Sequence, residues 1–505
     1  MTEISASYSE LLERLKEVEV LGEVMGILSW DQETMMPKGA NDARGLQKSL
    51  LSGMLHEKFT DKIFADLITR IRSELKSKNI TDQIIEANLR EFSRSYNRQT
   101  KVPKDLVEQI SLVETQAHAA WVEAREKDQF ALFAPFLEKL VALKKKESHC
   151  IDAARSPYDV QLEGYEVGLN SDTIAKIFSP LKDGLIDLIR KISSSKSKPN
   201  TEILKGRFDI SKQKEFCQDI AGSLGFNSDC GRMDQSVHPF CGGGGMTDVR
   251  ITTRFNEDDF LSCLFAVIHE TGHALYEQGL PKNLRYQPIC SARSMAVHES
   301  QSLLWEKQVG LSREFWTYYL PRAKETFDPA LRNASLDDFM FAISEVAASF
   351  IRVDADEVTY PLHVILRFEI EKDLFEGKIE VSDIPQIWNK RMHEYLRITP
   401  ATNRDGCLQD VHWSLGLFGY FPTYNLGAIY ASQIFHAIER DNPKIKDDFS
   451  KNQFAPLRKW LRVNLHEKGS ILETPALILE ITGQALDAEI HLKRLQKKYG
   501  DYYGV

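Results

Sequence analysis

The chain has 505 residues, of which 42% are apolar and 27% are charged, a composition typical of a globular protein with a packed core. Its formal net charge of -9 at pH 7 argues against nucleic acid as a partner, because phosphate binding depends on clustered Lys and Arg. The sequence contains no apolar run near the roughly 18 residues that a membrane span requires, and residues 1–20 lack the apolar core of a signal peptide.

The seven cysteines are scattered, and no two of them form a Cys-x-x-Cys pair. An odd, dispersed set in a large chain indicates reduced thiols in a cytosol-like compartment. We therefore expect a cytoplasmic protein with neither a membrane nor a nucleic-acid partner.

Residues 1–195 show the spacing of one helix after another. In the first of them, apolar side chains recur at steps of three and four residues, which places them on one helix face. These residues are Leu11, Leu12, Leu15, Val18, Val20 and Leu21. Helical patterns resume after residue 257, so the fold class is mainly α.

One strand is predicted at residues 248–255, where β-branched and polar residues alternate. Gly242 to Gly245 precede it and predict a flexible turn. The strand has two possible roles: as an edge strand it could pair with an extended substrate, or it only closes a small sheet.

The pattern His-Glu-x-x-His occurs at His269, Glu270 and His273. We expect it on a helix with Asn256 as N-cap and with Gly279 in the left-handed C-terminal position. Histidines four residues apart share one helix face and can reach one ion. Glu270 then lies beside the ion without being a ligand.

The third ligand is not the histidine of the longer His-Glu-x-x-His-x-x-Gly-x-x-His pattern, because Tyr276 and Gly279 hold those two positions. Glu299 on the following helix completes a His₂Glu set. The competing carboxylates are Glu277, expected on the wrong side of its own helix, and Glu306, two turns beyond Glu299.

Three protein ligands leave a fourth position for water, whose pKa a bound zinc ion lowers. The metal-bound water would attack a scissile carbonyl, with Glu270 as general base and then as acid to the leaving amine. This predicts a metal-assisted peptide hydrolase. The alternative from another class is a helical binding protein with a structural metal, which would not need Glu270 beside an open position.

Together with further blocks, these residues resemble the carboxypeptidase Taq family of metallocarboxypeptidases. The matching blocks are His238-Pro239-Phe240, Asp248-x-Arg250-x-Thr252, the zinc helix, His298 to Gln301, Ile351-Arg352-x-x-Ala355-Asp356, and Gly406 to Trp413 with Gln409 inside it.

The resemblance implies a mainly helical fold like neurolysin and angiotensin-converting enzyme, with a deep cleft and a small sheet. It also implies release of single C-terminal residues from peptides, one zinc or cobalt ion per chain, and a homodimer. We treat residues 1–505 as one peptidase unit, with an N-terminal helical half (1–235), a catalytic core (236–430) and C-terminal helices (431–505).

A carboxypeptidase binds a free α-carboxylate, a task that suits a guanidinium. Arg352 is the first candidate and Arg250 the second; the alternative is a structural ion pair with Asp354 or Asp356 for the former and with Asp248 for the latter. The resemblance also implies that the blocks containing His238, Asp248, Thr252 and Gln409 wall the substrate cleft.

The oxyanion of the tetrahedral intermediate needs a donor besides the metal. His412, Tyr420 and Tyr424 are the candidates, on a Gly-rich segment that we expect to be a loop. The rival enzymatic reading is an oligopeptidase or a dipeptidyl carboxypeptidase on the same scaffold.

Overall fold

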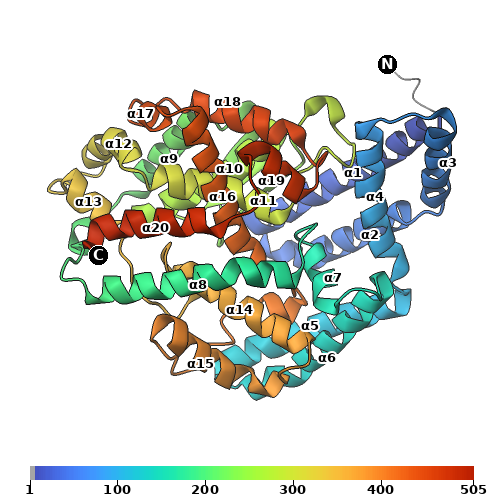
Figure 1. The fold of residues 1–505 in the computed structure, drawn as a ribbon, viewed down its shortest axis with the longest axis horizontal. Coiled ribbons are helices and arrows are strands. Elements are labelled where there is room, and N and C mark those ends of the chain that lie inside the picture. Colours follow the sequence, from blue (N-terminus) through green and yellow to red (C-terminus); the bar gives the residue numbers. More distant parts are fainter. Residues whose placement is uncertain (1–5) are drawn as a thin grey trace.

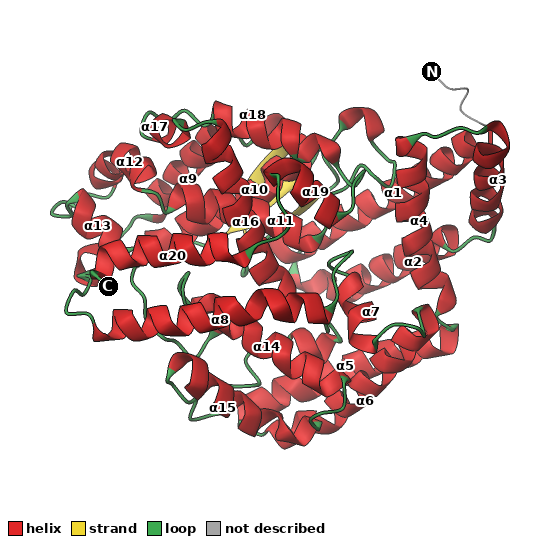
Figure 2. Cartoon of the chain, viewed as in Figure 1, coloured by secondary structure: helices red, strands yellow, loops and turns green. Residues whose placement is uncertain are grey.

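Helices form most of the molecule, and three short strands lie beside α10 (Figures 1 and 2). The computed structural model describes residues 6–505. The mainly α prediction with one small sheet is confirmed. None of the helices in the described range is both long and apolar enough to cross a membrane.

The N-terminal part is a succession of helices, as predicted. In α1, Leu11, Leu15 and Val18 are buried, whereas Val20 is 40% exposed and lies off the buried face. The helices are α1 (Ala6–Thr34), α2 (Asn41–Phe59), α3 (Ile63–Lys78), α4 (Gln83–Lys101), α5 (Lys104–Lys127), α6 (Phe130–Ile151), α7 (Pro157–Glu163), α8 (Ser171–Ser194) and α9 (Ile210–Leu224).

The central and C-terminal parts add eleven further α-helices and a π-helical segment among the described residues. They are α10 (Phe260–Gly279), α11 (Met295–Leu303), the π-helix η5 (Leu304–Gly310), α12 (Arg313–Thr326), α13 (Leu336–Ala342), α14 (Tyr360–Phe375), α15 (Ile384–Leu396), α16 (Pro422–Asp441), α17 (Ile445–Phe449), α18 (Ala455–Asn464), α19 (Thr474–Thr482) and α20 (Ala488–Tyr503).

The sheet has the strand order β1-β3-β2, with β1 (Gly231–Gln235), β2 (Cys241–Gly243) and β3 (Val249–Thr253). β3 pairs parallel with β1 and antiparallel with β2, so it is the central strand. Of the two alternatives for this strand, the edge strand is therefore wrong, and β3 closes the small sheet. β2 also extends into the segment predicted as a flexible turn, since it includes Gly242 and Gly243.

The main hydrophobic core joins distant parts of the sequence, from Ala117 to Tyr503. α8 packs along α20, and α14 and α15 pack against α8 (Figure 1). α10 lies between α9, β3, α11 and η5, and α11 packs against α16. The predicted division at residues 235 and 430 stays a prediction.

Candidate metal centre

Helix α10 carries His269, Glu270 and His273. Its N-cap is Asp259, whose side chain accepts hydrogen bonds from the backbone N–H groups of the first helical turn. The predicted N-cap Asn256 is wrong, because the helix begins three residues further on.

The end of α10 also differs from the prediction. Gly279 is the last helical residue and is not among the described residues with positive φ. A Cβ at Gly279 would lie 2.6 Å from Nδ1 of His466. This glycine is therefore needed for close packing and not for a left-handed turn.

Glu299 reaches the histidines from α11, which lies unusually close to both of its neighbours. A Cβ on Gly272 of α10 would lie 2.6 Å from the carbonyl oxygen of Gln301. A Cβ on Gly427 of α16 would lie 2.7 Å from Cγ of Glu299. Glycine at these two positions makes room for the backbone and side chain that carry the third ligand.

The structure brings the three predicted ligands together. Oε2 of Glu299 lies 3.4 Å from Nε2 of His273 and 3.7 Å from Nε2 of His269. One nitrogen or oxygen from each residue falls within 4.8 Å of the others. Because metal bonds to such atoms are about 2 Å long, this spacing suits one ion between them.

The charges around the ligands also suit a cation. Burial alone would lower the pKa of His269, but Glu299, Glu306 and Glu270 raise it to about 9. Burial lowers the pKa of His273 to about 4. A divalent ion fits this site by taking the place of the proton that the carboxylates draw onto His269.

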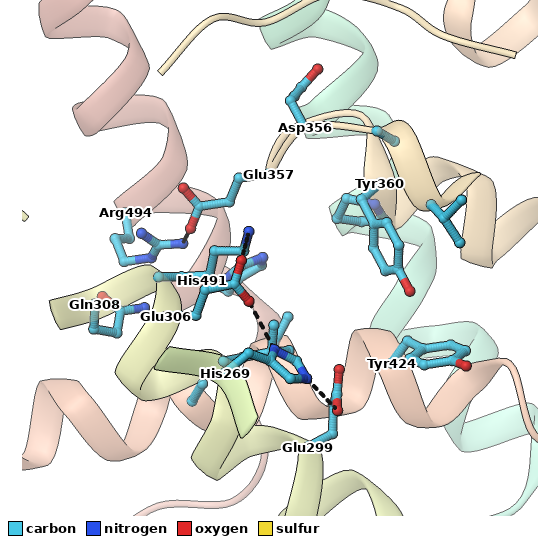
Figure 3. A pocket seen from close by; sticks show the side chains of 17 residues that line it. His269, Glu299, Glu306, Gln308, Asp356, Glu357, Tyr360, Tyr424, His491 and Arg494 are labelled. Atoms are coloured by element: carbon cyan, nitrogen blue, oxygen red, sulfur yellow. Dashed lines mark hydrogen bonds and ion pairs between the residues drawn. The ribbon is translucent and has the colours of Figure 1, made fainter. Parts of the chain in front are cut away.

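The outer nitrogen of His269 is held by a carboxylate. Its Nδ1 lies 2.8 Å from Oε2 of Glu306 (Figure 3). The other oxygen of Glu306 accepts a hydrogen bond from Lys307 at 2.6 Å. Both residues belong to η5, and π-helical turns are frequent at functional sites. Glu306 thus contacts a ligand residue from outside the triad.

The outer nitrogen of His273 faces another imidazole. Nδ1 of His273 lies 2.5 Å from Nδ1 of His298, and Nε2 of His298 lies 2.8 Å from Oε1 of Glu277. The prediction that Glu277 points to the wrong side of its helix is wrong. Glu277 follows His273 by four residues, which returns it to the same face.

Glu270 is buried next to the ligands. Burial raises its pKa to about 7, although His269 acts in the opposite direction. A carboxyl group with a pKa near neutrality can both take up and return a proton.

Two cavities meet at the ligands. The larger, of about 660 Å³, contains Glu270, His273 and Tyr420 in its wall, and the smaller, of about 210 Å³, is lined on its far side by Glu357 and Arg494 (Figure 3). The residues that line both cavities are His269, Glu299 and Tyr424. Substrate can therefore approach His269 and Glu299 from two sides.

Arg352 lies in the 3₁₀ helix η6 (Arg352–Asp354) and is buried. Its Nε and Nη2 donate to Oδ1 of Asp410 at 3.1 and 2.9 Å, and its Nη1 donates to the hydroxyl of Tyr360 at 2.8 Å. Its ion-pair partner is therefore Asp410, not Asp354 or Asp356. Arg352 does not line the smaller cavity itself, but it contacts Tyr360 and lies 5.0 Å from the ring centre of Tyr424, and both tyrosines line that cavity.

Gln409 and Arg367 complete this buried cluster. Arg367 donates to Oδ2 of Asp410 at 2.6 Å and to Oε1 of Gln409 at 2.7 Å, and the same amide oxygen accepts from the backbone N–H of Arg352 at 2.8 Å. Gln409 lines neither cavity.

Arg250 forms the ion pair with Asp248 that was predicted as its alternative to binding the substrate carboxylate. Its Nε and Nη2 each donate to one oxygen of Asp248 at 2.7 Å, and its guanidinium lies 4.5 Å from the ring centre of Trp30. Arg250 and Asp248 line neither cavity.

Thr252 supports the wall of the larger cavity from behind. Its buried hydroxyl contacts Ser236 at 2.6 Å and accepts from the backbone N–H of Phe240 at 3.0 Å. Phe240 lines the larger cavity. The side chain of His238 is exposed and lines neither cavity.

The three oxyanion candidates lie together but at different depths. The hydroxyl of Tyr424 is 3.4 Å from Nε2 of His412, and the rings of Tyr420 and Tyr424 have centres 5.5 Å apart. Tyr424 lies in the first turn of α16, not in a loop, whereas Tyr420 precedes that helix. His412 lines neither cavity.

Sequence reasoning missed the contacts of Glu306, His298 and Tyr360. Glu306 follows Glu299 by seven residues, two helical turns, so a shared face was a usable signal. No sequence pattern marked Tyr360 as a site residue, because the packing of α14 determines where its side chain lies.

Comparisons with known proteins agree over nearly the whole chain. Residues 10–499 match the family described as carboxypeptidase Taq (M32) metallopeptidase. The chain is 38% identical to thermostable carboxypeptidase 1 of Thermus thermophilus and 35% identical to carboxypeptidase 1 of Bacillus subtilis, with 99% of each chain covered in both cases.

The fold is also similar to a solved structure. The crystal structure of an M32 carboxypeptidase from Deinococcus radiodurans superimposes with a TM-score of 0.95 at 34% identity, covering 99% of this chain and 100% of the other.

Proposed function

This chain belongs to the carboxypeptidase Taq (M32) family of metallopeptidases and is a metallocarboxypeptidase, and we propose that Glu270 is its general base. The observation that carries this proposal is the position of Glu270, buried in the wall of the larger cavity beside the three ligands.

We propose that His269, His273 and Glu299 hold one divalent ion per chain, zinc first and cobalt second. The donor set of two imidazoles and a carboxylate is the one that catalytic zinc sites use. When bound, such an ion supplies Lewis-acid chemistry: it polarises a carbonyl and makes water more acidic.

Glu270 accepts the proton of the attacking water and then delivers it to the leaving amine. Burial helps in both steps, because a carboxylate with a raised pKa is a stronger base and its protonated form remains available near neutral pH.

Tyr424 is the proposed oxyanion donor, because it stands with His269 and Glu299 where the two cavities meet. Burial raises the pKa of Tyr424 well above its usual range, so the hydroxyl keeps its proton and can donate it in a hydrogen bond. Tyr420 and His412 remain the second and third candidates.

The smaller cavity favours release of one residue over release of a dipeptide. Its volume of about 210 Å³ is below the roughly 300 Å³ at which pockets for drug-sized ligands begin. We propose that it takes the C-terminal residue of a peptide. The longer part of the peptide then occupies the larger cavity.

Arg352 remains the first candidate for the α-carboxylate, through its position behind Tyr360, and Arg250 the second. His238, Asp248, Thr252 and Gln409 remain predicted wall residues of the substrate cleft. Of these, Thr252 has a contact that supports the role, through Phe240.

Digestion of one peptide with a free C-terminus and of its amidated form, with and without a chelator, tests the proposal. We expect stepwise loss of single residues from the free-ended peptide only, and no products with the chelator. Internal fragments or dipeptides in the mass spectrum would favour the oligopeptidase or dipeptidyl carboxypeptidase reading.

We further propose that the chain forms a homodimer through α2. This helix has no buried residue, although Leu46, Leu50 and Met54 recur at four-residue steps along it. Leu46 and Leu50 are 75% and 67% exposed. An apolar stripe of this kind on a helix favours burial against another surface, and a second copy supplies the same stripe.

Sedimentation of Leu46→Glu and Leu50→Glu variants tests the dimer. Both should shift the population to monomer, whereas Leu479→Glu, an equally apolar exposed position on α19, should not. A wild-type monomer at micromolar concentration would rule the proposal out.

We place the protein in the cytoplasm, on the ground that all seven cysteines are free thiols. Peptides with a free C-terminus are its proposed partners.

A further inference from the structure

We propose that His298 and Glu277 are positioning residues that fix the metal ligand His273 in one tautomer and one ring orientation. We call this pair, together with His273, the histidine relay. The inference rests on the proposed metal site, since it assigns the support of one of its ligands.

The donors and acceptors at its two contacts determine which ring nitrogens of the relay carry protons. Glu277 is a carboxylate and can only accept, so Nε2 of His298 must donate across the 2.8 Å contact. In a neutral imidazole the second nitrogen then accepts. Nδ1 of His298 therefore accepts, at 2.5 Å, the proton carried by Nδ1 of His273.

This assignment leaves Nε2 of His273 with a free lone pair, and Nε2 is the atom that faces Glu299. The opposite arrangement fails at one contact or the other. If His298 carried its proton on Nδ1, it would leave Glu277 without a donor, and His273 would hold its own proton on the nitrogen that must bind the ion.

Ring packing also restricts the orientation of the relay. The rings of His273 and His298 have centres 4.5 Å apart and planes 28° apart. The ring centre of Tyr276 lies 5.5 Å from that of His298, and the hydroxyl of Tyr276 accepts from the backbone N–H of Arg293. His298 therefore contacts two rings.

The two histidine ligands thus have different supports. Glu306 contacts His269 directly, whereas the carboxylate behind His273 acts through a neutral imidazole. Residues that orient metal-ligating histidines in this way typically contribute about 10- to 100-fold in metal affinity. The relay should therefore act on metal affinity before it acts on substrate binding.

The experiment measures zinc affinity of the full-length metal-free protein by competition with a chromogenic chelator. The variants are His298→Ala, His298→Asn and Glu277→Gln. The Asn variant is the rescue, because its side-chain oxygen, bonded to Cγ like Nδ1 of histidine, can still accept from His273. Glu306→Gln reports the separate support of His269, and His56→Ala, an exposed histidine on α2, is the control.

We expect His298→Ala to weaken zinc binding by about 10- to 100-fold, His298→Asn to recover most of that loss, and Glu277→Gln to lose less than His298→Ala. The d–d spectrum of the cobalt form should change in His298→Ala and not in His56→Ala.

Wild-type zinc affinity in both His298→Ala and Glu277→Gln would overturn the relay, and so would an Asn variant as weak as the Ala variant. Absence of zinc binding by the wild type would instead overturn the proposed metal site. Thermal unfolding of each metal-free variant identifies any that fails to fold. If His298→Ala does not fold, the zinc affinities of His298→Asn and Glu277→Gln decide whether the relay acts on His273.

Discussion

Two groups of charged side chains lie on either side of Tyr360, and they differ in what surrounds them. The proposed metal ligands open onto two cavities, and Glu299 and the neighbouring carboxylates raise the pKa of His269. The arginine cluster of Arg352, Arg367 and Asp410 is closed: both guanidinium groups bond to the one carboxylate, and Gln409 and Tyr360 fill further positions.

The two groups should therefore contribute to different free energies. The open site should affect the activation free energy of the reaction, and the closed cluster should affect the free energy of unfolding. Charges in the open site remain partly unsatisfied until a ligand arrives, so their removal should affect the reaction more than the fold. Charges in the closed cluster satisfy each other, so removal of one leaves another buried and unpaired, which costs stability.

Glu270→Gln should give the largest effect. We expect kcat/KM to fall by about a thousandfold, within the range for loss of a general base, with metal content unchanged. Stability should not fall, because burial opposes the charge that the change removes. Steady-state kinetics, metal analysis and thermal unfolding measure the three quantities, and full activity would place the base elsewhere.

Asp410→Asn should instead lower the free energy of unfolding by about 3–5 kcal/mol, because two buried arginines lose their shared charged partner. Denaturant unfolding measures this loss, with Asp354→Asn, an exposed carboxylate in η6, as the control. A variant as stable as the wild type would show that the closed cluster is not a stabilising unit.

The same variant has a pH signature. Burial acts to raise the pKa of Asp410, but Arg367 and Arg352 outweigh it and hold the pKa well below its usual range. A carboxyl group with a depressed folded pKa stabilises fully above its unfolded pKa of about 4, and this contribution disappears as the pH falls towards the folded pKa. The stability gap between wild type and Asp410→Asn should therefore be widest near neutral pH and narrow below pH 4.

Tyr424→Phe should lower kcat by about 100- to 1,000-fold, as for loss of one oxyanion donor. Tyr420→Phe, four residues earlier and before the start of α16, is the matched change and should lower kcat less. Both variants should keep wild-type stability. Unchanged kcat in both would remove the tyrosines from this role and leave His412.

Arg352→Ala tests whether Arg352 binds substrate or belongs only to the closed arginine cluster. If Arg352 binds the α-carboxylate, KM for a free-ended peptide should rise by roughly tenfold or more, as for a lost charge-assisted hydrogen bond, with little effect on the amidated peptide. Equal losses on both peptides would assign Arg352 to the closed cluster alone.

Local spacing was enough to predict three metal ligands that the structure brings close together. His269 and His273 are one turn apart, and Glu299 follows in the next helix, so the fold has little freedom in placing them. The N-cap was less well determined, since Asn256 and Asp259 lie in one acidic stretch, both have short accepting side chains, and only packing selects Asp259.

Long-range pairing could not be predicted in the same way. The partner of Arg352 is Asp410, 58 residues away, whereas the two carboxylates named from sequence were its near neighbours. Whether β3 is an edge strand stayed open at the level of sequence, because neither β1 nor the glycine-containing β2 has an alternating pattern, yet both pair with it.

The π-helix η5 has a consequence for how this chain tolerates insertions and deletions. A π-helical turn contains more residues than an α-helical one. Deletion of the one residue between Leu304 and Glu306, the buried Trp305, would allow regular α-helix from α11 onward. It would also turn Glu306 by about 100°, away from His269. The number of residues in this one helix therefore determines whether Glu306 can contact Nδ1 of the proposed metal ligand His269.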